Sequence, residues 1–164
     1  MQLVGSRAMK RVLVLGVVVG VAIAGFAAAQ PSVGGDYSGA YTCSQGLTGV
    51  TMSLRPAAGG DIDAIVTFYA HPGNPGVESG CYAARGHLDA TGRLVLMPGA
   101  WIYRPGPGWS TTQFDGRLDA AHGTFNGRVI APRNPSACAT FALRRGAVPF
   151  KAAPARCGQP ALVG

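Results

Sequence analysis

The chain has 164 residues, of which 48% are hydrophobic and only 13% charged, with a formal net charge of +7. Its basic residues form no cluster with interleaved aromatic residues, and such a cluster is what a nucleic-acid surface requires. The composition therefore disfavours a nucleic-acid-binding protein.

The first 29 residues have the pattern of a bacterial secretory signal peptide. Arg7, Lys10 and Arg11 precede an apolar run over residues 12–24, and small residues follow up to Ala29. A basic region, a short apolar region and an Ala-x-Ala site predict cleavage after Ala29. The run is short for a membrane span, which disfavours a retained anchor. We expect a periplasmic or secreted protein with no stable membrane anchor after cleavage, leaving eleven basic residues against seven acidic ones.

All four cysteines follow the predicted cleavage site, at Cys43, Cys81, Cys138 and Cys157. An even number of cysteines in an oxidising compartment predicts two disulfides. Their wide spacing, without a C-x-x-C motif or a nearby histidine in a ligand pattern, disfavours a zinc site. We expect no metal and no cofactor.

Beyond residue 36 the sequence alternates with period two and shows no helical periodicity. Glycine- and proline-rich turns separate the alternating segments, which is typical of short antiparallel strands. The segments are residues 37–41, 50–54, 62–68, 82–88, 94–96, 114–118, 125–129 and 139–143, with a further extended piece at 101–103. We predict an all-β fold, an antiparallel meander of about eight strands over residues 30–145. It closes into a small barrel or, alternatively, folds as a β-sandwich.

The meander also suggests a disulfide pairing. Cys43, at the end of the first strand, would meet Cys138, at the start of the last, if those two strands pair. Cys81–Cys157 would then tether residues 146–164, which we expect to be an irregular tail. Cys43 and Cys138 do not have matching face parity in the strand pattern, so other pairings stay open.

One short sequence recurs after thirty residues. Residues 86–90 (GHLDA) reappear as 116–120 (GRLDA), each followed by a turn and another strand. We interpret both as hairpin turns in which the aspartate caps the turn.

No sequence motif for catalysis is present. The chain lacks the usual hydrolase and phosphate-binding signatures. Asp61 and Asp63 share one face of a strand, and His71, His87 and His122 lie in or near loops. A periplasmic hydrolase using these aspartates or a histidine is an alternative. The scarcity of acidic residues disfavours an enzyme that uses acid–base catalysis.

The aromatic residues around one Pro-Gly loop form the candidate binding surface. Trp101, Tyr103, Arg104 and Trp109 fall within nine positions, and rigid aromatic rings beside an arginine suit stacking on a ligand. Gln45 in the first turn is a further candidate contact. Alternatively, Trp101 plugs the barrel and Arg104 covers it. We expect an exported, non-enzymatic binding domain for a small molecule, glycan or envelope protein. An inhibitor or accessory protein of a secreted enzyme is another alternative.

Three segments carry a resemblance: residues 41–49 (YTCSQGLTG), 101–105 (WIYRP) and 138–144 (CATFALR). In these segments the chain resembles a group of uncharacterised secreted bacterial β-domains, over most of residues 37–145. Similar segments occur as accessory domains of larger exported proteins, some with caspase-like peptidase regions. The resemblance implies no activity and transfers no catalytic residue. The strand pattern is also similar to avidin and lipocalin barrels, at the level of fold alone.

Overall fold

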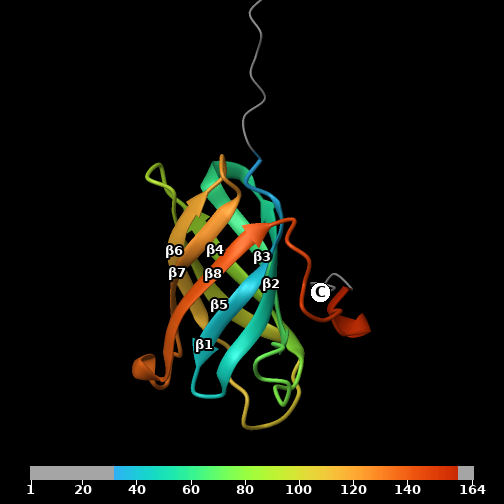
Figure 1. Ribbon diagram of the computed structural model, residues 1–164. Helices are drawn as coiled ribbons and strands as arrows, with labels where there is room; N and C mark the ends of the chain where they lie inside the picture. The colour runs from blue at the N-terminus through green and yellow to red at the C-terminus, as the bar shows by residue number, and fades with distance from the viewer. Residues whose placement is uncertain (1–31, 159–164) are drawn as a thin grey trace, which may run out of the picture.

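A computed structural model of the chain describes residues 32–158, which form one eight-stranded β-barrel (Figure 1). The predicted signal peptide, residues 1–29, lies outside the described residues. The strands are β1 (Gly35–Cys43), β2 (Gly46–Pro56), β3 (Asp61–Ala70), β4 (Gly80–Leu88), β5 (Arg93–Tyr103), β6 (Gln113–Asp119), β7 (Thr124–Ile130) and β8 (Cys138–Arg145). No helix within residues 32–158 is long and apolar enough to cross a membrane.

Each strand pairs antiparallel with the next in the chain, and β8 returns to pair with β1. This register places Gly39 opposite Leu143 and Tyr41 opposite Phe141. Closure removes the open edges that a flat sheet would present to solvent. The all-β meander and its barrel form are therefore confirmed, and the sandwich alternative is not adopted.

The predicted alternation determines which side chains fill the barrel. Inward positions are apolar, apart from Thr48 at the mouth end of β2, while their neighbours face out and are mostly polar. The largest fully buried inward side chains are Tyr37, Val50, Met52, Val66, Tyr82, Leu94, Leu96, Phe114, Phe125, Val129 and Leu143. The barrel is thus filled along most of its length by one continuous core.

Two expectations about the strands are wrong in detail. Residues 101–103 are not a separate strand but the end of β5, whose register against β4 shifts twice. Pro98 lies in this irregular stretch, and proline cannot donate a ladder hydrogen bond. In the sequence, the break in alternation around Pro98 resembled the boundary between two strands. Strict alternation over the predicted segment 139–143 would make Ala139 face the core with Phe141 and Leu143. Ala139 is exposed instead, because the register shift against β1 places two residues of β8 opposite one and reverses the alternation there.

The two ends of the barrel differ in the length of their connections. At one end, which we call the closed end, short turns span residues 57–60, 89–92 and 120–123. The other end, which we call the mouth, carries a tight β1–β2 turn and three longer loops, which lie at the bottom of Figure 1. These are the β3–β4 loop (71–79), the β5–β6 loop (104–112) and the β7–β8 loop (131–137).

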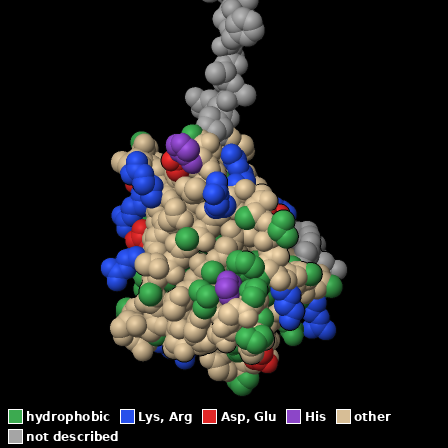
Figure 2. All heavy atoms as spheres, viewed as in Figure 1, with side chains coloured by type: hydrophobic (Ala, Val, Ile, Leu, Met, Phe, Trp, Pro, Cys, Tyr) green, Lys and Arg blue, Asp and Glu red, His purple; other side chains and the backbone are tan. Residues whose placement is uncertain are grey.

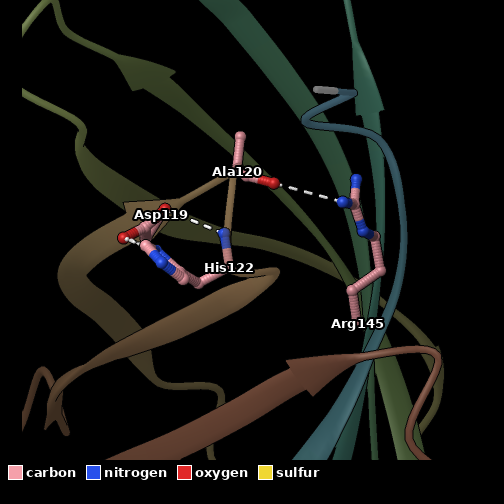
Figure 3. A network of polar contacts seen from close by, with 4 residues as sticks. All are labelled: Asp119, Ala120, His122 and Arg145. Atoms are coloured by element: carbon pink, nitrogen blue, oxygen red, sulfur yellow. Dashed lines mark hydrogen bonds and ion pairs between the residues drawn. The ribbon is translucent and has the colours of Figure 1, made fainter. Parts of the chain in front are cut away.

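Two aspartate-capped turns and one arginine order the closed end, and Figure 3 shows the Asp119 turn with Arg145. Asp89 accepts the backbone N–H of Thr91, and Asp119 accepts that of His122 in the same way, which confirms the role expected for the repeated sequence. Arg145 donates to the carbonyl oxygens of Ala120, at 3.1 Å, and of Ser32. It therefore connects the β6–β7 turn to the segment that leads into β1.

The two disulfides are Cys43–Cys138 and Cys81–Cys157, the pairing preferred from the sequence. The register between β1 and β8 shifts between Tyr41 and Cys43, so that Cys43 comes to lie opposite Cys138. An irregularity of this kind adds a residue to one strand and reverses its face parity. It therefore removes the parity mismatch that had left other pairings open.

Residues 146–158 follow the outer surface of the barrel, and we call them the C-terminal strap (Figure 1). Gly146 donates its N–H to the carbonyl of Asp36, and Cys157 joins the strap to β4. The Phe150 ring packs edge-on against the ring of His71, with 4.4 Å between centroids. Figure 2 shows hydrophobic side chains gathered around one histidine on the face in view. The strap thus covers part of the outer surface rather than extending from it.

Candidate functional site: the mouth of the barrel

A cavity of about 330 Å³ opens at the mouth, between the last inward side chains of the core and the loops above them. Its lining comes from the ends of β1, β3, β4 and β8, the β1–β2 turn, the β5–β6 loop and the β7–β8 loop. This volume is at the lower end of the range for small-molecule sites. A cavity at a barrel mouth is also a common position for such a site.

The floor of the cavity contains two buried phenols. Tyr41 accepts a hydrogen bond from the side-chain amide of Gln45 at 3.1 Å, and Tyr82 donates to the carbonyl of Thr112 at 2.9 Å. Burial raises the pKa of Tyr82 to about 12. Burial, and secondarily the neighbouring Tyr82, raises the pKa of Tyr41 even further. Both hydroxyls therefore stay neutral at physiological pH, and the floor is polar but uncharged.

An aromatic stack forms one wall. Trp109 lies almost parallel to Phe68, with 4.8 Å between ring centroids and 21° between ring planes. The indole N–H of Trp109 donates to Glu78 at 2.9 Å, which fixes the ring from the neighbouring β3–β4 loop. Trp101 meets both Phe68 and Tyr82 edge-on from beside the cavity. The indole ring of Trp109 is therefore fixed in orientation, and a fixed aromatic ring suits stacking on a flat group of a ligand.

Arg104 folds the β5–β6 loop back on itself. Its guanidinium donates to the carbonyls of Pro107 and Trp109 and lies 5.8 Å above the ring of Trp101. The loop is rich in proline and glycine and contains no regular structure, so these contacts set the position of Trp109. Arg104 is a positioning residue for the aromatic wall.

Gln45, Asn74 and Arg133 organise the rim. Asn74 donates its side-chain amide to the carbonyl of Gln45 at 2.7 Å, which ties the β3–β4 loop to the β1–β2 turn. Arg133 is exposed and lines the cavity from the β7–β8 loop. Among the residues that the structure describes, no aspartate or glutamate lines the cavity.

The five residues predicted from the sequence to contact a ligand differ in their position relative to the cavity. Gln45 and Trp109 line the cavity, while Trp101 and Arg104 lie beside it and support Trp109. Tyr103 lies away from it, on the outer side of β5, with the guanidinium of Arg156 5.8 Å above its ring.

Sequence reasoning missed Tyr41, Tyr82 and Arg133 as parts of a site. The first two lie within the predicted strand segments 37–41 and 82–88 and were given no role beyond the fold. The feature of the sequence that could have indicated this site is the alternation of short and long connections between strands. In a meander this alternation places every longer loop at one end of the barrel. Inward aromatic residues at that end of a strand then become candidates for a cavity floor.

The candidate hydrolase residues lie elsewhere. A larger and shallow hollow of about 710 Å³ on the outer face of β3, β4 and β5 contains Asp61, Asp63 and His87. His87 pairs with Asp61 at 3.1 Å, and Asp63 pairs with Arg85 at 2.8 Å, all with well-exposed side chains. No serine, threonine or cysteine lines this hollow among the described residues. The arrangement is that of surface charge pairs, with no nucleophile beside the histidine.

The other two histidines are apart from this hollow and from each other. His71 packs against Phe150 of the strap, and His122 pairs with Asp119 at the closed end. Within residues 32–158 there is no group of three or more His, Cys, Asp or Glu side chains that could hold a metal ion.

The fold and the cavity define a class: a disulfide-closed, eight-stranded antiparallel barrel with a small cavity at one end. A comparison with protein-family models and with curated proteins finds no match.

Proposed function

We propose that this chain is an exported binding domain that holds a small organic molecule in the mouth of its barrel. The observation that carries the proposal is the cavity itself. It is floored by two neutral phenols and walled by the Phe68–Trp109 stack, a combination of apolar surface and a few placed polar groups that is usual in ligand sites.

Export is supported by two features. The pattern of residues 1–29 is that of a signal peptide, and both disulfides belong to the type of bond that persists in oxidising compartments. A small molecule is favoured over a glycan or an envelope protein because the cavity is narrow and partly enclosed. A protein partner would need a broad, flat surface instead.

The first test is native mass spectrometry of the protein purified from the compartment to which it is exported, with a denatured control. We expect a non-covalent mass excess that denaturation releases. A bare protein mass in several preparations, together with no binding in a small-molecule screen, would contradict the proposal.

Two substitutions test whether the ligand is bound in the cavity at the mouth. Trp109→Ala should abolish or weaken retention of the ligand while the near-UV circular dichroism keeps the signature of a folded barrel. Met97→Ala is the matched control, because Met97 is an exposed apolar residue on the outer face of β5 and should leave retention unchanged. Equal retention by both variants would place the ligand elsewhere.

A further inference from the structure

The charges around the mouth indicate which ligands it would hold. Beside the cavity lies a second hollow of about 390 Å³, and the two share Gly108, Trp109, Ser110 and Arg133. Arg104 lines this second hollow as well. Trp109 therefore stands between an uncharged interior and a rim that carries two guanidinium groups.

The two guanidinium groups differ in what they already contact. Arg104 is engaged with the carbonyls of its own loop, whereas Arg133 belongs to none of the four ion pairs found within residues 32–158. Neither hollow is lined by an aspartate or glutamate in the described part of the chain. Glu78 is the nearest acid in the contacts of this region, and it accepts the indole N–H of Trp109. The rim thus has a positive charge available to a ligand.

The interior cannot hold a charge of its own. Its floor consists of the two phenols and its wall of the Phe68–Trp109 stack, and none of these supplies a cationic partner for a buried anion. Burying an unpaired carboxylate would be very costly. A charged group on a ligand would therefore remain at the rim, where Arg133 can form a charge-assisted hydrogen bond with it.

We propose, on the basis of the function proposed above, that the mouth selects a flat organic anion. The flat apolar body enters the cavity beside Trp109, and its carboxylate or other anionic group stays at the rim against Arg133. The chemical class is a small aromatic or conjugated acid.

The test compares two probes of nearly the same shape, 2-naphthoate and its uncharged analogue 2-naphthamide, by isothermal titration calorimetry. We expect the wild-type protein to bind the anion about tenfold more tightly or better, since a hydrogen bond to a charged group is worth about that factor. Arg133→Gln should bring the two affinities together, mainly by weakening naphthoate. Because Arg133 is exposed, this variant should keep the wild-type melting temperature.

Arg117→Gln is the matched control. Arg117 is an exposed arginine on β6 and lines neither hollow, so its loss changes the net charge equally without touching the rim. It should keep the full preference for naphthoate. If Arg117→Gln loses the preference as Arg133→Gln does, general surface charge is responsible and the proposal is overturned.

The remaining outcomes separate this inference from the proposed function. Equal binding of both probes to the wild type, lost in Trp109→Ala, would keep the cavity as a binding site and overturn the selection of anions. A preference for naphthoate that survives in Arg133→Gln would overturn the role of Arg133. Binding of neither probe would overturn this inference, whereas the proposed function is overturned only by a bare mass in native mass spectrometry together with a screen that finds no ligand.

Discussion

At the scale of single residues, four glycines lie where neighbouring strands approach too closely for a side chain, and one of them also makes room for an aromatic ring. Gly39, Gly86, Gly116 and Gly127 all occupy positions where an added Cβ atom would lie within 2.4 Å of a backbone carbonyl oxygen. Gly116 and Gly127 face each other across β6 and β7. The requirement is close approach of neighbouring atoms, since none of the four has a positive φ.

Phe141 occupies the space that this pair of glycines leaves. Its ring packs edge-on against Phe114 at 5.2 Å and against Phe125 at 4.8 Å. A Cβ atom at Gly116 would lie 2.8 Å from the Cζ of Phe141 and 2.3 Å from the carbonyl oxygen of Asn126. Relief of these contacts would have to move both the ring and a neighbouring strand.

We therefore predict that Gly116→Ala lowers the free energy of unfolding by about 1–3 kcal/mol, the usual cost of overpacking a core. Urea denaturation monitored by tryptophan fluorescence measures it. Gly76→Ala is the control, because a Cβ there meets nothing within 4 Å and the change should stay within about 0.5 kcal/mol. Equal effects of the two substitutions would contradict the packing argument.

The two tryptophans should differ in the same measurement. Both are half-buried and pack against the core. Trp101 belongs to β5 and meets two core rings edge-on, those of Phe68 and Tyr82, so Trp101→Ala should cost about 3 kcal/mol, the lower end of the cost for buried aromatic residues. Trp109 lies on the loop above the core, and its replacement should cost clearly less. If Trp109→Ala were the more destabilising, Trp109 would belong to the core rather than to a binding surface.

At the scale of the elements, the Cys43–Cys138 disulfide links the first and last strands at the mouth. The two cysteines are 95 residues apart in the chain, so the bond closes a loop that includes most of the barrel. We predict that Cys43→Ser with Cys138→Ser lowers the free energy of unfolding by about 2–5 kcal/mol. Hydrogen exchange should speed up most at the mouth ends of β1 and β8.

The strap disulfide should behave differently. Cys81→Ser with Cys157→Ser releases the strap but leaves the ladder between β1 and β8 intact. Trypsin should then cut faster at Lys151 and Arg156 within the strap, while exchange at the mouth ends of β1 and β8 stays slow. Unchanged tryptic cleavage would show that other contacts, such as that of Phe150 with His71, hold the strap on their own.

At the scale of the whole molecule, the buried phenols make stability depend on alkaline pH. Tyr82 has its pKa raised from 10.0 to about 12 by burial, and that of Tyr41 is raised further. The unfolded chain ionises these groups first, so their contribution is complete below pH 10 and is lost as the pH rises through the folded pKa. The same direction of shift holds for Tyr37 and Tyr69.

We predict that the free energy of unfolding falls by about 2–3 kcal/mol or more between about pH 9 and pH 11, because Tyr41 and Tyr82 each contribute up to about 1.4 kcal/mol per pH unit. Urea denaturation at both pH values measures the fall. Tyr82→Phe should reduce it, because phenylalanine cannot ionise. A fall of the same size in that variant would assign the pH dependence to other groups.

The sequence allowed most of the barrel to be predicted, because alternation and turn residues are local signals. Predicting the inward side chains of β2, β3 and β4 required no information from distant parts of the chain. The same holds for the two aspartate turns. The interruption at Pro98 was misread as a strand boundary because a bulge within one strand has the same local signs as a turn. Ala139 was misplaced because the bulge between Cys138 and Phe141 reverses the alternation, and the sequence does not reveal that bulge.

The candidate cavity was harder to predict because it depends on contacts between segments far apart in the sequence. Trp109 is held by Glu78 from another loop, and Arg133 reaches the mouth from a third. The grouping of aromatic residues in the sequence indicated the region from Trp101 to Trp109. It could not show that Tyr103, which the strap covers from outside, lies away from the cavity. The side on which each aromatic residue lies follows from the register of β5, whose irregularity the sequence does not reveal.

The first strand begins and the last strand ends at the same end of the barrel, and this has a practical consequence for immobilising the protein. Gly35 begins β1 and Arg145 ends β8 at the closed end, where Tyr37 lies opposite Arg145 and the Tyr37 hydroxyl donates to the carbonyl of Val33. A biotin or surface linker attached at Ser32 would therefore lie at the closed end, a full strand length from the mouth. A sensor chip coated in this way would present every mouth to the solution, with ligand access independent of the coating density.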